Sequence, residues 1–274
     1  MKAFVVKNIE RRLLILDALI LGVGFLMIYM FPFSFGVRDL NEIRAKKELR
    51  VAINMNQIDY MFRGDSLAGF QYELVKYLCD SALHVKPKFI RVQSFQAAIQ
   101  ELLDGKVDLI AQNIPLTSET KKSILISYPI LVSRAVLVQH KNSKGNDLIT
   151  NQLDLKEKQI SVPLNSYYIQ LIRHLAHEVS DTIYINQMRV YDPEELILLV
   201  AKGSIPYTIA DERVARYFSK RFTNIDVSLP MGFSQLQGWG LNPQTPKLDS
   251  LINHWLPIFE KSTAFHQLYN KYYH

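Results

Sequence analysis

The stretch FQAAIQELLDGKVDLIAQNIPLTSETKK, residues 95–122, decides the fold of this chain. Its first nine residues place apolar side chains at helical spacing, and Asp104-Gly105 then ends the helix. Val107–Ala111 follows as a short buried strand that opens into a polar loop, Gln112–Lys122. Such a unit is typical of α/β sheets, whose ligands lie beyond the carboxyl ends of the strands. The sequence therefore predicts that this loop carries function.

The segments on either side repeat this alternation of helix and strand, and a polar break at 141–147 divides it into two series. The fold class is therefore α/β, with two lobes, right-handed crossovers and mostly parallel sheets. Extended runs at 130–140 and 233–241 flank the second series, as if the chain crosses over and returns. We predict lobe 1 at 37–140 plus 235–274 and lobe 2 at 141–234, with a small-molecule site in the cleft between them.

The N-terminus predicts a membrane anchor over residues 1–36. Residues 13–33 are apolar apart from Asp17, and that length suits one bilayer crossing. A cleaved signal peptide is the competing interpretation, but the apolar run is longer than usual and no A-x-A site follows it. Basic residues flank the run on both sides, so charge alone leaves the topology open.

Composition excludes several classes of function. With 48% hydrophobic and 21% charged residues the chain is globular, and its net charge of +6 forms no basic stripe interleaved with aromatics. We therefore expect no nucleic-acid partner. The single cysteine, Cys79, lies in an apolar-periodic run and predicts a core position. His174 and His177 lack a third ligand at metal spacing, and no catalytic motif is present, so we expect no metal, no cofactor and no catalytic residues.

Several motifs in order resemble the family 3 extracellular solute-binding proteins, the amino-acid-binding type of periplasmic binding protein. These are KELRVAIN (47–54), LAGFQYELVKYL (67–78), the stretch 98–122 and YPILVSRAVLV (128–138). ISVPLNSYY (160–168), residues 194–215 and LQGWGLNP (236–243) are similar to the non-catalytic N-terminal domain of membrane-bound lytic transglycosylase F. The resemblance implies two lobes that close over a ligand by hinge motion. It also implies a single-pass inner-membrane protein with its soluble part in the periplasm, and no peptidoglycan-cleaving domain in this chain.

The resemblance assigns ligand contacts to the second lobe. Asp211 matches an acid that pairs with the ligand's ammonium group, although a helix N-cap is the competing interpretation. Asn165, Ser166 and Tyr167 match a loop that offers a helix N-terminus to the ligand's acidic end. An ordinary Asn/Ser cap is the alternative there.

In the first lobe, Tyr60 and Phe62 match an aromatic loop that stacks on ligand side chains, with packing in the lobe core as the alternative. Asn113 and Thr117 match polar positions of the ligand loop. Thr120 stands where the family carries an arginine that binds the α-carboxylate bidentately, a geometry that lysine does not reproduce.

Thr120 and Pro115 together remove two of the family's carboxylate contacts, because proline has neither N–H nor hydroxyl. Lys121 and Arg134 are the residues that could compensate. The sequence therefore argues against binding of an α-amino acid in the way that is usual for the family.

Three functions follow as hypotheses. The first is a membrane-anchored, non-catalytic solute-binding protein for a small amino-acid-like or muropeptide-like ligand. The second is a module without ligand that regulates an envelope enzyme, such as a lytic transglycosylase, or a transporter partner. The third is a dehydratase of the cyclohexadienyl type, against which Thr120 argues because its substrate also carries a carboxylate.

Overall fold

The structure is a computed structural model that describes residues 36–141, 148–180, 182–190 and 194–273. The predicted membrane-spanning stretch 13–33 lies outside these residues. The same holds for Asp192-Pro193, where the sequence pattern predicts the start of a helix. Val37–His274 forms one compact unit, separate from Met1–Gly36. Within the described residues, no helix has the length and apolar character that a bilayer crossing requires.

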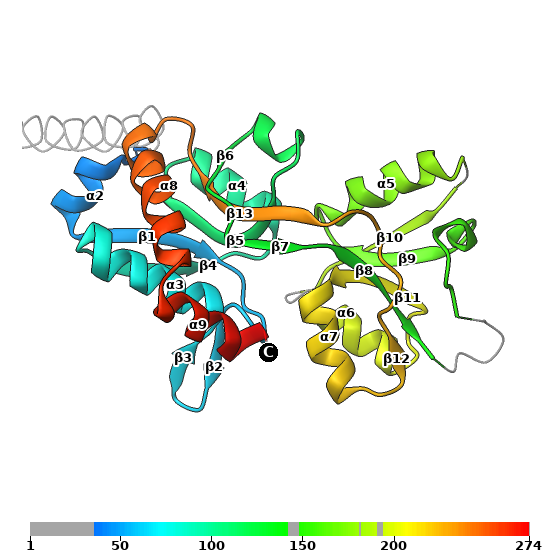
Figure 1. Cartoon of the computed structure of the whole chain (residues 1–274). Helices are drawn as coiled ribbons and strands as arrows, with labels where there is room; N and C mark the ends of the chain where they lie inside the picture. The colour runs from blue at the N-terminus through cyan, green and yellow to red at the C-terminus, as the bar shows by residue number, and fades with distance from the viewer. Residues whose placement is uncertain (1–35, 142–147, 181, 191–193, 274) are drawn as a thin grey trace, which may run out of the picture. The chain divides into compact units, whose positions relative to one another are not determined.

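The first lobe of this unit is built on a sheet with the strand order β4-β1-β5-β13-β6, and β7 pairs with β13 (Figure 1). β1 lies parallel to β4 and β5, whereas β13 is antiparallel to β5, β6 and β7. The strands are β1 Glu48–Ile53, β4 Lys86–Arg91, β5 Leu109–Pro115, β6 Leu125–Ile126, β7 Leu131–Ser133 and β13 Gln235–Leu241. The helices are α2 Leu40–Lys46, α3 Phe70–Leu78, α4 Phe95–Leu103, α8 Pro246–Glu260 and α9 Thr263–Tyr273, and β2 Met61–Arg63 pairs with β3 Ser66–Ala68 as a hairpin.

The second lobe has the strand order β10-β9-β11-β8-β12. β9 is parallel to β10 and β11, and β8 runs antiparallel to β11 and β12. The strands are β8 Ala135–His140, β9 Gln159–Pro163, β10 Tyr184–Met188, β11 Tyr207–Asp211 and β12 Ile225–Asp226. The helices are α5 Tyr168–Glu178, α6 Glu194–Ala201 and α7 Glu212–Arg221.

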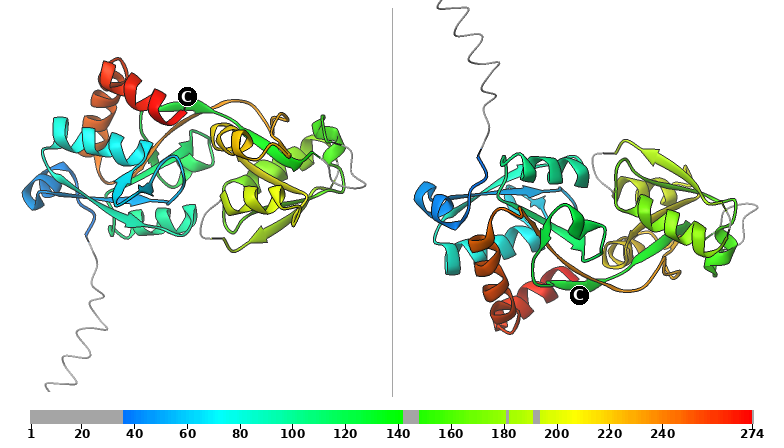
Figure 2. Two further views of the ribbon diagram at one scale, coloured as in Figure 1. Left: turned by 90° about the horizontal axis from the view of Figure 1, so that it is seen from below. Right: turned by 90° about the horizontal axis from the view of Figure 1, so that it is seen from above.

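Two extended segments join the lobes, as Figure 2 shows from two further sides. One passes from β7 into β8, and the other returns through Leu229–Met231 into β13. The segments pair, because Leu137 N–H donates to Leu229 O at 2.9 Å and Gln235 lies opposite Ser133. The chain enters the second sheet at Ala135, so the predicted end of lobe 1 at residue 140 is too late. The sequence pattern missed this because one continuous extended run serves both sheets.

The unit that decides the fold forms as predicted at its start and differs at its end. Ser94 caps α4, accepting a hydrogen bond from Ala97 N–H at 3.1 Å. β5 then continues to Pro115, so the predicted loop from Gln112 is wrong over its first four residues. Those residues stay extended because β13 pairs with them, with Ile114 opposite Gly238. The partner strand lies far along the chain, where a local pattern cannot register it.

The start of α5 also differs from the prediction. Asn165 and Ser166 do not cap the helix, because Asn165 adopts a left-handed turn with φ of 56°. Tyr167 holds the N-cap position, although its side chain makes no capping hydrogen bond, and the helix begins at Tyr168. The turn therefore presents Asn165–Tyr167 ahead of the helix.

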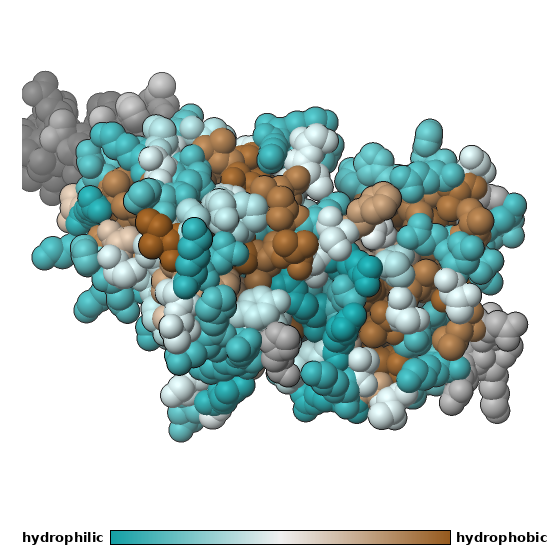
Figure 3. Space-filling model, in the orientation of Figure 1, coloured by the Kyte–Doolittle hydropathy of each residue, from teal (hydrophilic) through white to brown (hydrophobic). Residues whose placement is uncertain are grey.

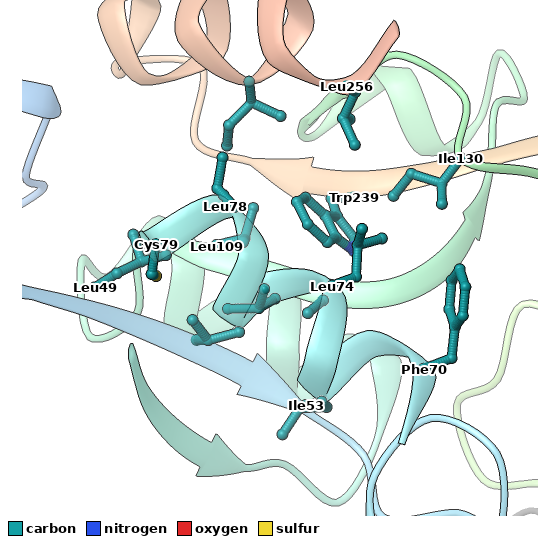
Figure 4. Close-up of a cluster of buried hydrophobic side chains, with 14 of the residues drawn as sticks. Leu49, Ile53, Phe70, Leu74, Leu78, Cys79, Leu109, Ile130, Trp239 and Leu256 are labelled. Atoms are coloured by element: carbon teal, nitrogen blue, oxygen red, sulfur yellow. The ribbon is translucent and has the colours of Figure 1, made fainter. Parts of the chain in front are cut away.

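The core of the first lobe surrounds Trp239, as Figure 4 shows with Leu74, Leu109 and Leu256 around the indole. Trp239 is fully buried, and its indole N–H donates to the side-chain oxygen of Gln71 at 2.6 Å. Cys79 is also fully buried in this core. The face in Figure 3 is mostly hydrophilic, with separate apolar areas on both lobes.

Candidate ligand-binding cleft

A cavity of ≈ 680 Å³, called the cleft below, lies between the lobes. Its walls come from the carboxyl-terminal parts of β5, β9 and β11, from the loops that follow β1, β4, β9 and β10, and from the first turns of α4, α5, α6 and α7. This is the place where open parallel sheets bind ligands, here contributed by two sheets that face each other. Its polar lining residues are Asn54, Asn56, Asp59, Gln93, Ser94, Gln112, Asn113, Asn165, Ser166, Tyr167, Tyr168, Arg189, Glu194 and Asp211.

Asp59 is a buried carboxylate of the cleft with a raised pKa. It is only 7% exposed, and burial raises its pKa to about 6, with the nearby charge of Asp211 adding to the rise. The side-chain amides of Asn56 and Asn113 donate to its Oδ2 at 3.1 and 3.3 Å, and the Tyr273 hydroxyl donates to Oδ1 at 3.4 Å. These weak bonds only partly replace water, so a cationic ligand would gain from pairing with Asp59.

Asp211 both caps a helix and faces the cleft. One of its oxygens accepts from Arg213 N–H at 2.9 Å, which fixes the start of α7. The other accepts from the side-chain amide of Gln237, on the returning strand β13, at 3.2 Å. The two interpretations of Asp211 are therefore compatible, because the cap occupies one oxygen and leaves lone pairs of the other available.

The positive charge of Arg213 partly offsets the negative charge of Asp211 between the lobes. Its guanidinium lies 3.8 Å from the Asp211 carboxylate and 4.8 Å from the ring centre of Tyr273, the latter on α9 of the first lobe. It also donates to Val132 O at 2.9 Å. Arg213 therefore joins both lobes behind the cleft without appearing among its lining residues.

Neutral amides form the wall of the cleft in the first lobe. Gln112 donates to Asn54 at 2.8 Å, and Gln71 donates to Asn113 at 2.7 Å. Since Gln71 also accepts from the buried indole of Trp239, the wall is anchored in the core of the lobe. Fixed amides that are already paired orient polar groups at low entropic cost to binding.

The lobes also touch through Glu194, which lines the cleft. The backbone N–H of Gln57 donates to the carboxylate of Glu194, 3.0 Å from each oxygen. Glu194 is 4% exposed and is the first described residue of α6. Phe95 and Tyr167 meet edge to face across the lobes, with ring centres 6.4 Å apart.

The structure brings together five of the predicted site residues in the cleft, namely Asn113, Asn165, Ser166, Tyr167 and Asp211. Tyr60 and Phe62 do not line it. Tyr60 is buried in the first lobe and stacks on Phe89 at 5.6 Å, so its aromatic ring packs the lobe interior. Phe62 is 61% exposed on β2.

The two threonines of the ligand loop also lie outside the cleft. Thr120 is buried, and its hydroxyl donates to Pro115 O at 2.6 Å, which braces the loop after β5. Neither suggested substitute for the family arginine supplies a cation to the cleft. Arg134 pairs bidentately with Glu212 at 2.9 and 3.1 Å, and Lys121 is exposed and does not line the cleft.

Sequence reasoning missed Asp59, Glu194 and Arg213. The sequence signal for Asp59 is its place in the loop after the first strand, next to Tyr60. Glu194 and Arg213 gave no local signal, because each acts on a residue of the other lobe. Across the residues that the structure describes, no group of three His, Cys, Asp or Glu side chains could hold a metal ion.

The fold and cleft define a two-lobed α/β ligand-binding protein. Residues 49–274 match the bacterial extracellular solute-binding proteins, family 3, and the chain belongs to that family. Its relatives include the membrane-bound lytic murein transglycosylase F of Aeromonas salmonicida, 30% identical over 74% of this chain and 40% of that protein. The same enzyme of Desulfosudis oleivorans is 24% identical over 93% of this chain and 54% of that protein. The predicted family and its likeness to transglycosylase F are confirmed, and the chain spans about half the length of these relatives.

Solved structures support the two-lobed fold. An ancestral arginine-binding protein bound to arginine has a TM-score of 0.72, with 24% identity over 83% of this chain and 99% of that one. The solute receptor for L-cysteine of Neisseria gonorrhoeae has a TM-score of 0.75, with 17% identity over 86% of this chain and 93% of that one. An ancestral amino-acid-binding precursor of cyclohexadienyl dehydratase has a TM-score of 0.73, with 23% identity over 86% of this chain and 99% of that one. At these identities the likeness concerns the fold alone.

Proposed function

We propose that this protein is a non-catalytic receptor that captures a small, polar, amino-acid-like ligand in the cleft, with the ligand's cationic group between Asp59 and Asp211. The main support for this proposal is that Asp59 and Asp211 line the cleft from opposite lobes, and that burial raises the pKa of Asp59 to about 6. A ligand cation between them would join the lobes, which is how binding drives hinge closure. The solute-binding family supports a small solute as the ligand, and amino-acid-binding proteins share the fold.

The residues of the cleft define the binding of the ligand's cationic group better than the binding of its carboxylate. The cleft offers three carboxylates against one lining arginine, and Thr120 removes the family's guanidinium. A carboxylate directly beside the bound ammonium group should therefore add little to the affinity. Arginine and agmatine form a matched pair, because they differ only in that carboxylate.

Calorimetric titration with arginine, agmatine and putrescine tests the proposal. We expect binding of at least one of them, and a loss of about tenfold or more in affinity for Asp211→Asn. Asp65→Asn, in the exposed turn between β2 and β3, is the matched control because it makes the same chemical change away from the cleft. No heat and no thermal shift with any cationic compound would overturn the proposal.

We further propose that residues 13–33 anchor the protein in the bacterial inner membrane with the two lobes in the periplasm. The apolar length of that stretch and the family of extracellular proteins support this location. Protease added to intact spheroplasts should digest the lobes. Without protease, the intact protein should be recovered in the membrane fraction. Protection of the lobes, or recovery in the soluble fraction, would contradict it.

Regulation of an envelope enzyme is the second candidate function. The observation that favours it is the relationship to transglycosylase F, of which this chain matches only part. Crosslinking in intact cells, followed by purification from membranes, would recover a specific transglycosylase if this function holds. A cleft with no measurable ligand would strengthen this alternative over the first.

A further inference from the structure

A second cavity of ≈ 630 Å³ adjoins the cleft and is called the back compartment below. The two spaces share four lining residues, Phe95, Asn165, Ser166 and Tyr167, which come from α4 of one lobe and the start of α5 of the other. Together they offer far more room than a single α-amino acid fills, since drug-sized ligands occupy pockets of roughly 300–1,000 Å³.

The two compartments differ in charge. The cleft is lined by Asp59, Glu194 and Asp211 against a single cation, Arg189. The back compartment is lined by Arg134, Arg173 and His174 against a single acid, Glu119. It also has a set of hydroxyl groups from the loop after β5 and from β7, namely Thr117, Ser118, Thr120, Ser123 and Ser133.

Two serine hydroxyls of this region lack hydrogen-bond partners. Ser133 is 5% exposed and lines the back compartment, and its Oγ has no partner among the described residues. The buried Oγ of Ser166, between the compartments, also has none. Burial without a hydrogen-bond partner destabilises a polar group, so a ligand that reaches these hydroxyls by a small adjustment gains binding energy.

The acidic end of a ligand finds no guanidinium at the family position, since Thr120 replaces it and turns its hydroxyl to Pro115 O. Arg134 is held by Glu212, whereas Arg173 is exposed on α5 and forms no ion pair with any described residue. The available cation of the back compartment is thus Arg173, beside His174.

We propose that the back compartment binds the carboxylate of an extended zwitterionic ligand whose ammonium group lies in the cleft. This inference rests on the proposed function, because the ammonium position is taken from it. The ligand passes the aromatic pair Phe95 and Tyr167, so its two charges are separated by several bonds. Short peptides fit this description, since each extended residue adds roughly 3.3–3.6 Å between the termini.

Oligoglycines test the proposal because they vary only the distance between the two charges. Titration calorimetry of the full chain would use glycine, triglycine, pentaglycine and the C-terminal amide of each peptide. We expect a peptide to bind about tenfold or more tightly than glycine, and its amide to lose about that factor, because a charge-assisted bond is removed.

Variants then locate the carboxylate. Arg173→Ala should bind the acid and the amide with equal affinity, whereas Arg173→Lys should keep part of the preference for the acid. The matched control is Lys220→Ala, an exposed cation on α7 of the same lobe that lines neither compartment. Equal binding of acid and amide to the unmodified protein, or an unchanged preference in Arg173→Ala, would overturn the inference.

The outcomes also separate this inference from the proposed function. If agmatine or putrescine binds while peptide length and amidation have no effect, the back compartment is not a ligand site and the proposed function stands. If no cationic compound or peptide binds at all, both are overturned.

Discussion

Replacing Asp59 by asparagine should stabilise the protein while weakening its function. Burial raises the pKa of this carboxyl from 3.8 to about 6, so the folded protein bears a cost whenever Asp59 is ionised. A shift of about two pKa units corresponds to about 3 kcal/mol. Asparagine has nearly the same shape and no charge, and Asp59→Asn removes that cost.

The effect should depend on pH in a defined direction. Because the folded state holds the proton more tightly than the unfolded state, the cost appears as pH rises from about 4 through about 6 and is complete above it. The gain from Asp59→Asn is then about 3 kcal/mol at about pH 7.5 and about 1 kcal/mol at about pH 4.5. For a chain of this size, each kcal/mol moves the melting temperature by roughly 2–4 °C.

Thermal unfolding at both pH values measures this, with Asp65→Asn as the exposed control. We expect Asp59→Asn to melt about 6–12 °C above the unmodified protein at about pH 7.5, with a smaller difference at about pH 4.5. A lower melting temperature at neutral pH would show that the bonds from Asn56, Asn113 and Tyr273 outweigh burial. A gain that does not vary with pH would also refute the reasoning.

Three further substitutions test the contact between the lobes, a buried ion-pair group of the first lobe and the turn beside Asp59. Glu194→Gln weakens the bond from Gln57 N–H, so ligand dissociation measured by stopped flow should accelerate; an unchanged rate would show that this contact does not hold the lobes together. Asp108→Ala leaves two arginines without their buried carboxylate and should lower the free energy of unfolding in urea by about 3–5 kcal/mol. Gly69→Ala would place a Cβ 2.2 Å from Asp59 O at a φ of +141°, so we expect loss of both stability and ligand binding in calorimetry; an intact cleft in this variant would contradict the geometry.

The sequence allowed the fold to be predicted because the signals for it are local. The apolar period of Phe95–Leu103, the stop at Gly105 and the buried strand that follows need no distant partner to be recognised. Failures occurred where a partner from elsewhere decides the structure. β5 extends to Pro115 because β13 pairs with it, and Ala135–His140 belongs to the second sheet because β11 and β12 pair with it.

The site was predictable only in part, for a related reason. A carboxylate at the end of a strand, such as Asp211, has a position that pattern and resemblance both indicate. The importance of Asp59 depends on its burial and on the charge of Asp211 in the other lobe, neither of which a sequence states. Tyr60 shows the converse, because an aromatic residue in the same loop packs inward against Phe89.

The replacement of the family's arginine by Thr120 does not by itself decide between a lost ligand and a different ligand. The sequence shows that the family's arginine is missing, which suggests either a lost ligand or a different one. The structure adds that Thr120 is integrated in its loop through Pro115 O, while the cleft keeps two facing carboxylates and a wall of paired amides. A buried carboxylate whose pKa is raised to about 6 costs stability when it is ionised, and a bound cation would offset that cost. The missing arginine therefore favours a ligand that is bound by its cationic end first, and it makes the position of the ligand's acidic end the question that decides specificity.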